Sequence, residues 1–227
     1  MSFLSRLFGK NKISAKSNKS TDSISEVNVL GKYFNLTDLM IIPLGEILSL
    51  VPIDATSIDG MDKIMLETLS QTPRIKKYIP QLDFSNPNNS SEKFFTRLVL
   101  QTENGLGFSY GLYINNGLAG MIMVETPEYN KLTIGFEHWT FSFFSLMGFE
   151  QRGLMSASLP RFLHYMKENI GVKELYAIVD ADNTRSIRLL QKFMFDEVDN
   201  SGWEGQGSSN DAPKVFSCNL STINFRG

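Results

Sequence analysis

The stretch Phe149-Glu150-Gln151-Arg152-Gly153-Leu154-Met155-Ser156 places a glycine-bearing turn between a strand-like apolar segment and the start of a helical pattern. In a strand–turn–helix unit, the first N–H groups of the helix have no backbone partner, and the positive end of the helix dipole points the same way. Such an end binds phosphate groups, and Gly153 allows phosphate oxygens to approach the backbone. An ordinary loop-to-helix junction fits the same residues, so the rest of the chain must decide.

A second element of this kind lies further along the chain. Residues 174–179 form an apolar run typical of a buried strand, and Asn183-Thr184-Arg185-Ser186 then opens a helix that we expect over residues 183–194. Two helix N-termini that each follow a strand can be directed at one point. The pair therefore favours a diphosphate site.

The elements around these two units are expected to build an antiparallel sheet and several helices. The turn Asn115-Asn116-Gly117 lies between two strand-like runs and predicts a β-hairpin. Pro160 is expected to kink or delay the helix that ends at Gly171. The expected strands are 46–52, 108–114, 118–124, 132–144, 174–179, 195–198 and 215–220. Helices are also expected over 58–70, with caps among Asp54 to Ser57 and a buried face of Ile58, Met61, Ile64, Met65 and Leu69, and from Ser90 or Ser91 to about 102.

Composition excludes several classes of protein. Hydrophobic residues make up 42% of the 227 residues, enough for a packed core. Five basic residues and no acidic residue lie in residues 1–20, so residues 21–227 carry 17 basic and 24 acidic residues. That acidic body argues against nucleic-acid binding, which needs a basic face. One cysteine and two histidines indicate a cytoplasmic protein without a metal cluster.

Residues 1–30 differ from the remaining chain and are expected to form a flexible basic extension to a domain over residues 31–227. Phe3, Leu4, Leu7 and Phe8 have helical spacing, and a Lys/Ser/Asn-rich stretch follows them. A short basic amphipathic segment of this kind predicts weak contact of residues 1–20 with a membrane surface or a partner. A frayed terminus is the alternative. No apolar run reaches the ~20 residues that cross a bilayer.

The order of these elements, together with five local motifs, resembles the GNAT acetyltransferase superfamily and, within it, the ribosomal-protein-alanine acetyltransferase type. The resemblance covers about residues 46–220. It implies an α/β fold with a mixed, mostly antiparallel sheet of about seven strands, flanked by helices and splayed at the fourth and fifth strands. The motifs are LSLVPID (48–54), PRIKKYIP (73–80), TIGF (133–136, taken as the start of the fourth strand), FEQRGLMSASL (149–159) and DNTRSIRLLQKFMF (182–195).

The resemblance implies acetyl-CoA as the acetyl donor. In the family, the pattern Q/R-x-x-G-x-G/A holds the pyrophosphate of acetyl-CoA through backbone amides. Here Glu150 stands where that pattern has Gln or Arg, and Met155 where it has Gly or Ala. A carboxylate beside a diphosphate is unfavourable unless it points away. The cofactor-binding residues implied by position are Leu146, Gln151, Arg152, Gly153, Leu154, Met155, Ser156, Asn183 and Ser186.

The implied reaction is direct attack of a neutral amine on the thioester, with a protein N-terminus or a small amine as acceptor. The amine must first lose a proton, so a base is expected on or beside the fourth strand. Thr133 occupies the position where this type often has a glutamate, which leaves Glu137 and His138 as candidate bases. Because neighbours on a strand face opposite sides, only one of these two can point into the cleft. A surface ion pair for Glu137 and a structural role for His138 are the alternatives.

Ser186 is the candidate that protonates the leaving thiolate, with helix capping as its alternative. Leu190 occupies the position where some members carry a tyrosine acid. Together with Glu150, Thr133 and Pro160, it motivates a second hypothesis, in which the chain is a catalytically weakened GNAT-fold protein that binds or scaffolds.

Overall fold

The computed structural model describes residues 33–34, 36–56, 58–199 and 212–223. The expected extension over residues 1–30, and the membrane contact expected of residues 1–20, lie outside these ranges. Among the described residues, no helix is long and apolar enough to cross a membrane.

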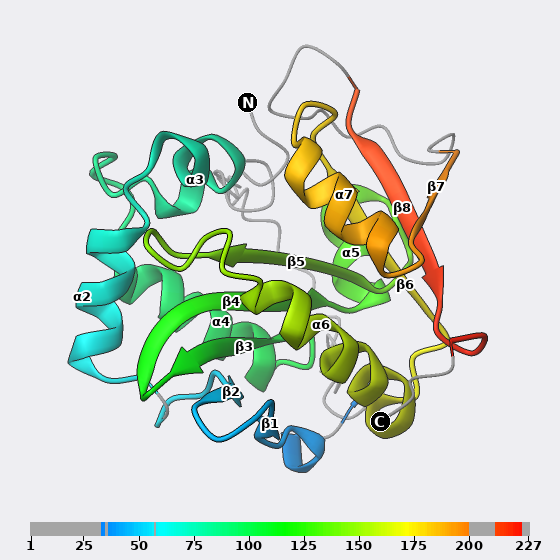
Figure 1. Ribbon diagram of the computed structural model, residues 1–227, viewed down its shortest axis with the longest axis horizontal. Coiled ribbons are helices and arrows are strands. Elements are labelled where there is room, and N and C mark those ends of the chain that lie inside the picture. Colours follow the sequence, from blue (N-terminus) through cyan, green and yellow to red (C-terminus); the bar gives the residue numbers. More distant parts are fainter. Residues whose placement is uncertain (1–32, 35, 57, 200–211, 224–227) are drawn as a thin grey trace, which may run out of the picture.

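One mixed sheet of eight strands runs through the described part of the chain, in the order β1-β2-β3-β4-β5-β6-β8-β7 (Figure 1). Every neighbouring pair is antiparallel except β5 and β6, which are parallel. The expected α/β architecture with a mostly antiparallel sheet is therefore confirmed, with eight strands in place of about seven. The strands are β1 Ile42–Pro43, β2 Leu48–Pro52, β3 Gly107–Ile114, β4 Gly117–Glu125, β5 Thr140–Ser145, β6 Glu174–Val179, β7 Asp196–Val198 and β8 Lys214–Asn219.

The hairpin β3–β4 forms where the sequence predicts it. Asn115 and Asn116 both adopt left-handed backbone conformations, with φ of 47° and 65°. Two consecutive residues of this kind make the tight turn whose twist matches that of the flanking strands, and asparagine tolerates the conformation well.

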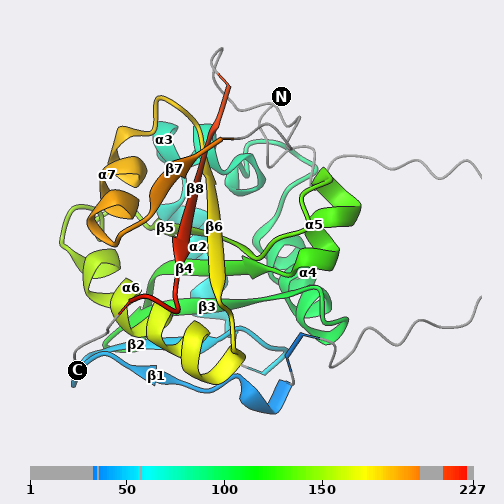
Figure 2. The ribbon, with the colours of Figure 1, turned by 90° about the vertical axis from the view of Figure 1, so that its right-hand side faces the viewer.

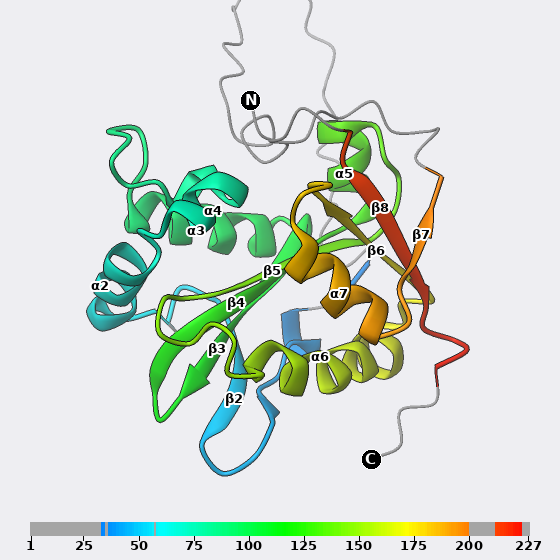
Figure 3. The ribbon, with the colours of Figure 1, turned by 45° about the horizontal axis from the view of Figure 1, so that its top comes forward.

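Helices cover both faces of the sheet. Figure 3 shows α2, α3 and α4 on one side and α6 and α7 on the other. Tyr110 and Leu112 of β3 pack in the same core cluster as Phe162 of α6, whereas Met121 of β4 packs with Leu98 of α4 in a second cluster. The helices are α2 Gly60–Leu69, α3 Pro73–Tyr78, α4 Ser91–Glu103, α5 Pro127–Ile134, α6 Leu154–Tyr165 with a π-helical extension Met166–Ile170, and α7 Thr184–Lys192, besides single 3-10 turns at Leu36–Asp38 and Pro80–Leu82.

Helix α2 corrects two sequence-based expectations. Its N-cap is Asp59, whose carboxylate accepts from the N–H of Asp62 at 2.9 Å, and the caps expected among Asp54 to Ser57 are wrong. The expected buried face is also partly wrong, because Met61 and Ile64 are 60% and 58% exposed. Leu66, by contrast, is fully buried.

The sequence predicts one long strand over residues 132–144, and this prediction is wrong. Helix α5 occupies the first part: Thr126 caps its N-terminus, Pro127 is its first residue, and Gly135 ends it in a left-handed conformation with φ of 73°. A loop then leads to β5, which begins only at Thr140. Proline at the first helical position and glycine just past the last are strong helix boundaries, and they override the aromatic alternation of this stretch. Consequently the TIGF motif does not start a strand.

Helix α6 begins at Leu154 and continues through Pro160, so proline does not delay its start. The helix widens into the π-helical turn before Gly171, which ends it with φ of 79° as expected.

The sheet separates between β5 and β6. The two strands share one paired position, Thr140 with Tyr176, and are unpaired beyond it. In Figure 2, β6 and β8 run across the direction of β3 and β4, so the two halves of the sheet diverge strongly. The expected splay between these two strands, the fourth and fifth in the family's order, is therefore confirmed.

Candidate active site

A cavity of about 440 Å³ lies where the sheet separates. Residues 141–145 of β5 and 177–179 of β6 line it from the two sides of the split, and the N-terminal ends of α6 and α7 line it as well. Strands that are unpaired here leave space between them, because no ladder hydrogen bonds hold them at the usual spacing of about 4.8 Å.

The turn before α6 presents free backbone N–H groups to this cavity. Gln151 and Gly153 are left-handed, with φ of 60° and 75°, and no side chain caps the helix. The first N–H group inside the helix ladder is that of Ala157, which donates to Gly153 at 2.9 Å. The N–H groups of Leu154, Met155 and Ser156 therefore have no helical partner, and all three residues line the cavity.

The backbone at Gly153 is open to the cavity. A Cβ built on this residue would meet no atom within 4 Å. The left-handed conformation favours glycine, and the absence of a side chain leaves the peptide accessible to a bound group. This turn fits a diphosphate.

Helix α7 provides a second set of N–H groups. Its N-cap residue, Asn183, makes no capping hydrogen bond through its side chain. The first ladder bond runs from Ile187 to the Asn183 carbonyl at 3.1 Å. Asn183, Arg185 and Ser186 all line the cavity, so the sequence-predicted pair of turns does converge on one site.

Two arginine side chains contact polar groups of the turn before α6 at the cavity wall. Glu150 lines the cavity and lies 3.9 Å from Arg74, which also donates to the Asn183 side chain at 3.4 Å. Arg185 lies beside Gln151, whose amide oxygen, when directed toward it, accepts at 3.0 and 3.1 Å. Arg74 thus offsets the negative charge that Glu150 would place beside a diphosphate.

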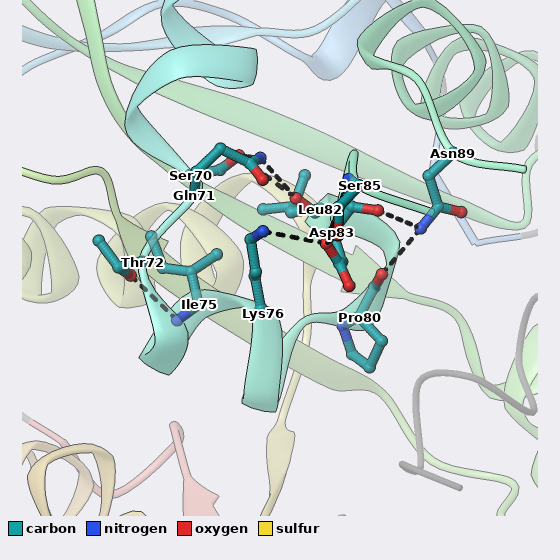
Figure 4. Close-up of polar contacts among 10 residues, drawn as sticks. All are labelled: Ser70, Gln71, Thr72, Ile75, Lys76, Pro80, Leu82, Asp83, Ser85 and Asn89. Atoms are coloured by element: carbon teal, nitrogen blue, oxygen red, sulfur yellow. Dashed lines mark hydrogen bonds and ion pairs between the residues drawn. The ribbon is translucent and has the colours of Figure 1, made fainter. Parts of the chain in front are cut away.

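Helix α3 forms the wall opposite α7. Thr72 caps it by accepting from the N–H of Ile75 at 3.2 Å, and Lys76 pairs with Asp83 at 3.1 Å. Asn89 then holds the following segment by donating to the carbonyls of Pro80 and Asp83 at 2.9 and 3.0 Å, as Figure 4 shows. These local contacts fix a helix of only six residues that would be unstable alone.

Two side chains of α3 reach across to the loop before α7. Tyr78 donates to Asp182 at 3.1 Å, and Lys77 forms a hydrogen-bonded ion pair with the same carboxylate. The bond from Lys77 holds the pKa of Asp182 below its usual value. Arg74 and these two residues therefore connect α3 to both turns that flank the cavity.

The two candidate bases lie outside the cavity. Glu137 is 58% exposed in the loop after α5 and pairs with Lys131 at 2.8 Å. The ring of His138 packs between Phe136 and Tyr176, with centroids 4.6 and 4.5 Å away. Glu137 and His138 do not alternate along a strand, contrary to the expectation, because β5 starts after them.

The other sequence-predicted residues are placed as follows. Leu146 is fully buried, and its backbone N–H and carbonyl already bond to Ala119 and Phe149. Arg152 lies over the Phe149 ring at 6.0 Å and does not line the cavity. Of the predicted cofactor-binding residues, those the structure brings to the cavity are Gln151, Gly153, Leu154, Met155, Ser156, Asn183 and Ser186.

Sequence reasoning missed one ionisable group beside this site. Glu125, at the end of β4, is only 8% exposed, and burial raises its pKa to about 7. It accepts from the hydroxyl of Thr140 at 3.0 Å. A carboxylate at the end of a long apolar strand run was the available signal, because such a position is seldom charged without a reason.

The sheet separates between β5 and β6, and two helix N-termini without side-chain caps lie at this separation. Their free N–H groups suit a cofactor that contains a diphosphate. The acetyltransferase (GNAT) domain model matches residues 49–196, more than half of the chain. The chain therefore belongs to the GNAT acetyltransferase family, and it is classed with N-acetyltransferases, which use acetyl-CoA as the acetyl donor.

Solved structures share this fold. The RimL ribosomal L7/L12 alpha-N-protein acetyltransferase in complex with coenzyme A is 17% identical, with a TM-score of 0.59 over 81% of this chain and 100% of that one. An acetyltransferase of Salmonella typhimurium that modifies the N-terminal serine of ribosomal protein L7/L12 is 16% identical, with a TM-score of 0.54 over 79% and 99%. An acetyltransferase from Agrobacterium tumefaciens is 11% identical, with a TM-score of 0.59 over 90% and 99%. No curated protein sequence matches the chain.

Proposed function

We propose that the chain transfers the acetyl group of acetyl-CoA to the primary amine of a protein N-terminus or of a small molecule. The observation that carries this proposal is the convergence of two uncapped helix N-termini, those of α6 and α7, on one cavity at the split of the sheet. Acetyl-CoA supplies a diphosphate for these N–H groups and a thioester for the amine to attack.

The residues that would hold acetyl-CoA are those of the two turns. The N–H groups of Leu154, Met155 and Ser156 bind the diphosphate, and Gly153 leaves the space that it needs. Asn183 and Ser186 contact the carrier from the opposite wall. We also assign to Ser186, which lines the cavity, the protonation of the leaving thiolate.

The acceptor enters on the side of α3. Ile75 and Ile79 of this region, with Met123 and Phe144 from the sheet, give the cavity an apolar wall there. Such a wall fits a flexible chain end or a small molecule better than a charged surface. An α-amino group suits the reaction, because its reference pKa of about 7.8 leaves a useful neutral fraction at pH 7, whereas a lysine near 10.4 does not.

Two of the solved structures that share the fold are described as acetyltransferases of ribosomal protein L7/L12, one of them acting on an N-terminal serine. This similarity supports a protein N-terminus as the acceptor. We place the proposed reaction in the cytoplasm, where acetyl-CoA and new protein N-termini are both present.

A second candidate function is binding without turnover. Glu150 lines the cavity in place of a neutral or basic residue, and Leu190 is fully buried where some members have an acid. In this case the chain would hold CoA and act as a sensor or scaffold.

Titration calorimetry with acetyl-CoA, followed by turnover assays, separates these alternatives. We expect binding in the micromolar range and release of free thiol with peptides that begin with serine or alanine. Absence of binding at millimolar acetyl-CoA would contradict both candidate functions. Binding without thiol release across a panel of peptides and amines would favour the sensor.

A further inference from the structure

The N-terminus of α7 lacks a cap that its own sequence offers. Asparagine is among the best N-cap residues, because its side-chain oxygen accepts from the second or third N–H group of the helix. Asn183 holds that position in α7 but makes no such bond. Four other helices of the described residues do have a side-chain cap, formed by Asp59, Thr72, Ser90 and Thr126. The uncapped state of α7 therefore needs a physical cause.

The backbone at Asn183 forms a tight turn instead of the extended conformation of a capping residue. Its φ and ψ are −81° and 61°, and the Thr184 N–H group donates to the Asp182 carbonyl at 2.9 Å. These are the features of an inverse γ-turn. The four capping residues, by contrast, have ψ between 145° and 179°. The N–H groups of Arg185 and Ser186 consequently make no hydrogen bond within the part of the chain that the structure describes.

Arg74 of α3 holds the Asn183 side chain from across the cavity. Its guanidinium donates to Asn183 Oδ1 at 3.4 Å and lies 3.9 Å from the Glu150 carboxylate. Both Arg74 and Asn183 line the cavity. The oxygen that would cap α7 is therefore engaged by Arg74, which leaves the amide nitrogen of Asn183 as a free donor.

Helix α3 is a fixed support for this contact. Ile75 and Ile79 are only 4% and 8% exposed and belong to one buried core cluster. Thr72 caps the same helix. Arg74 is thus attached to an element whose position the core determines.

The same face of α3 also holds the residue before Asn183. Residues three and four apart on a helix are neighbours, so Arg74, Lys77 and Tyr78 share one face. Lys77 and Tyr78 both bond to the Asp182 carboxylate. Two consecutive residues of the turn before α7 are therefore held from α3.

We propose that Arg74 is a positioning residue for acetyl-CoA, which acts by keeping the Asn183 side chain away from the start of α7. The N–H groups of Arg185 and Ser186 then stay available to the carrier, whose diphosphate and amide-containing arm both supply oxygen acceptors. This inference rests on the proposed acetyl transfer. It also gives a role to Glu150, which departs from the family pattern and contacts Arg74 from the other turn.

Loss of Arg74 has a defined structural consequence. Without the guanidinium, ψ of Asn183 can move into the extended region, and Oδ1 can accept from the N–H group of Arg185 or Ser186. The new cap stabilises α7 and competes with the carrier for the same donors. Acetyl-CoA binding should therefore weaken although the fold is not destabilised.

Amide hydrogen exchange, measured by NMR on the free full-length protein, tests the capping step. In the wild type we expect the Arg185 and Ser186 amides to exchange without protection. In Arg74→Met, at least one of them should become protected by about threefold or more. Arg161→Met removes an exposed arginine of α6 that does not line the cavity, and this matched control should leave both amides unchanged. No gain of protection in Arg74→Met overturns the proposal.

A double-mutant cycle, measured by calorimetry with acetyl-CoA, tests whether Arg74 acts through Asn183. All four proteins carry Glu150→Gln, so that loss of Arg74 leaves no unpaired carboxylate beside the diphosphate. We expect Arg74→Met to weaken binding by about tenfold when Asn183 is present, and by less than about twofold when Asn183→Ala has removed its side chain. An equal loss in both backgrounds overturns the proposal, because Arg74 would then act on the carrier independently of Asn183.

The outcomes separate this inference from the proposed function. Where the Asn183→Ala proteins bind acetyl-CoA too weakly for the cycle, the amide exchange decides, because it needs no ligand. Wild-type turnover together with a failed exchange or cycle result overturns the role of Arg74 and leaves acetyl transfer intact. Absence of binding by the wild type at millimolar acetyl-CoA contradicts the transfer reaction and this inference together.

Discussion

Replacement of Gly153 by alanine tests the candidate diphosphate site. Gly153 has φ of 75°, and an added Cβ would meet no atom within 4 Å, so the folded protein has room for it. A non-glycine residue in this conformation costs roughly 1–2 kcal/mol, and alanine recovers about 0.4–1 kcal/mol by restricting the unfolded chain. We therefore expect Gly153→Ala to lower the free energy of unfolding by about 1 kcal/mol. The added methyl group would also stand where the diphosphate approaches the backbone.

Gly135→Ala is the matched control. Gly135 ends α5 with φ of 73°, and a Cβ there also meets nothing within 4 Å, but it does not line the cavity. Both variants should lose about 1 kcal/mol in urea unfolding. Only Gly153→Ala should weaken acetyl-CoA binding, by at least tenfold in calorimetry, or about 1.4 kcal/mol. Equal acetyl-CoA affinities of the two variants would refute the assignment of this turn to the diphosphate.

Three further predictions follow from the contacts around the site. Thr126→Ala removes the N-cap of α5 and should lower the free energy of unfolding by about 1 kcal/mol in urea, with unchanged stability contradicting the observed cap. Asp182→Asn weakens the contacts of Lys77 and Tyr78 with the loop before α7 and should raise the acceptor KM in steady-state assays. Thermal stability should change little, because exposed ion pairs contribute little to the free energy of unfolding, and an unchanged KM would show that this contact plays no part in acceptor binding. Burial raises the pKa of Glu125 from 4.5 to about 7, so the protonated side chain contributes its full stability below pH ~4.5 and loses it as the pH rises through 7. Between pH 4.5 and pH 8, the unfolding free energy of the wild type should therefore fall by about 3 kcal/mol more than that of Glu125→Gln, and parallel curves of the two proteins would contradict this.

Sequence patterns predicted the parts of the fold that short-range rules control. The hairpin at Asn115-Asn116-Gly117 and the helix after Gly153 each depend on a turn whose residues tolerate the left-handed backbone conformation. The fold and the two turns of the site followed from such signals and from the resemblance to the GNAT family.

The stretch 126–139 was misread although its sequence contains the correct boundaries. Thr126-Pro127 and Gly135 mark the start and end of a helix, but the aromatic residues that follow suggested one long strand. The same error placed Glu137 and His138 on a strand, and both were therefore considered as the base although neither lies at the cavity.

The remaining features depend on contacts between distant segments. Lys77 and Tyr78 meet Asp182 across more than one hundred residues of sequence. The Glu125–Thr140 bond depends on the register of β4 with β5, which became visible only once β5 was known to begin at Thr140. No local pattern reports such pairings.

The central claim is that the amide groups at the start of α6 hold the diphosphate of acetyl-CoA. Backbone amide chemical shifts, measured by NMR during titration of the labelled protein with acetyl-CoA, test it directly. The account predicts that the largest saturating shifts belong to Leu154, Met155 and Ser156, with smaller ones at the start of α7. Saturable binding that leaves these amides unmoved, or the absence of any shift at millimolar acetyl-CoA, would contradict it.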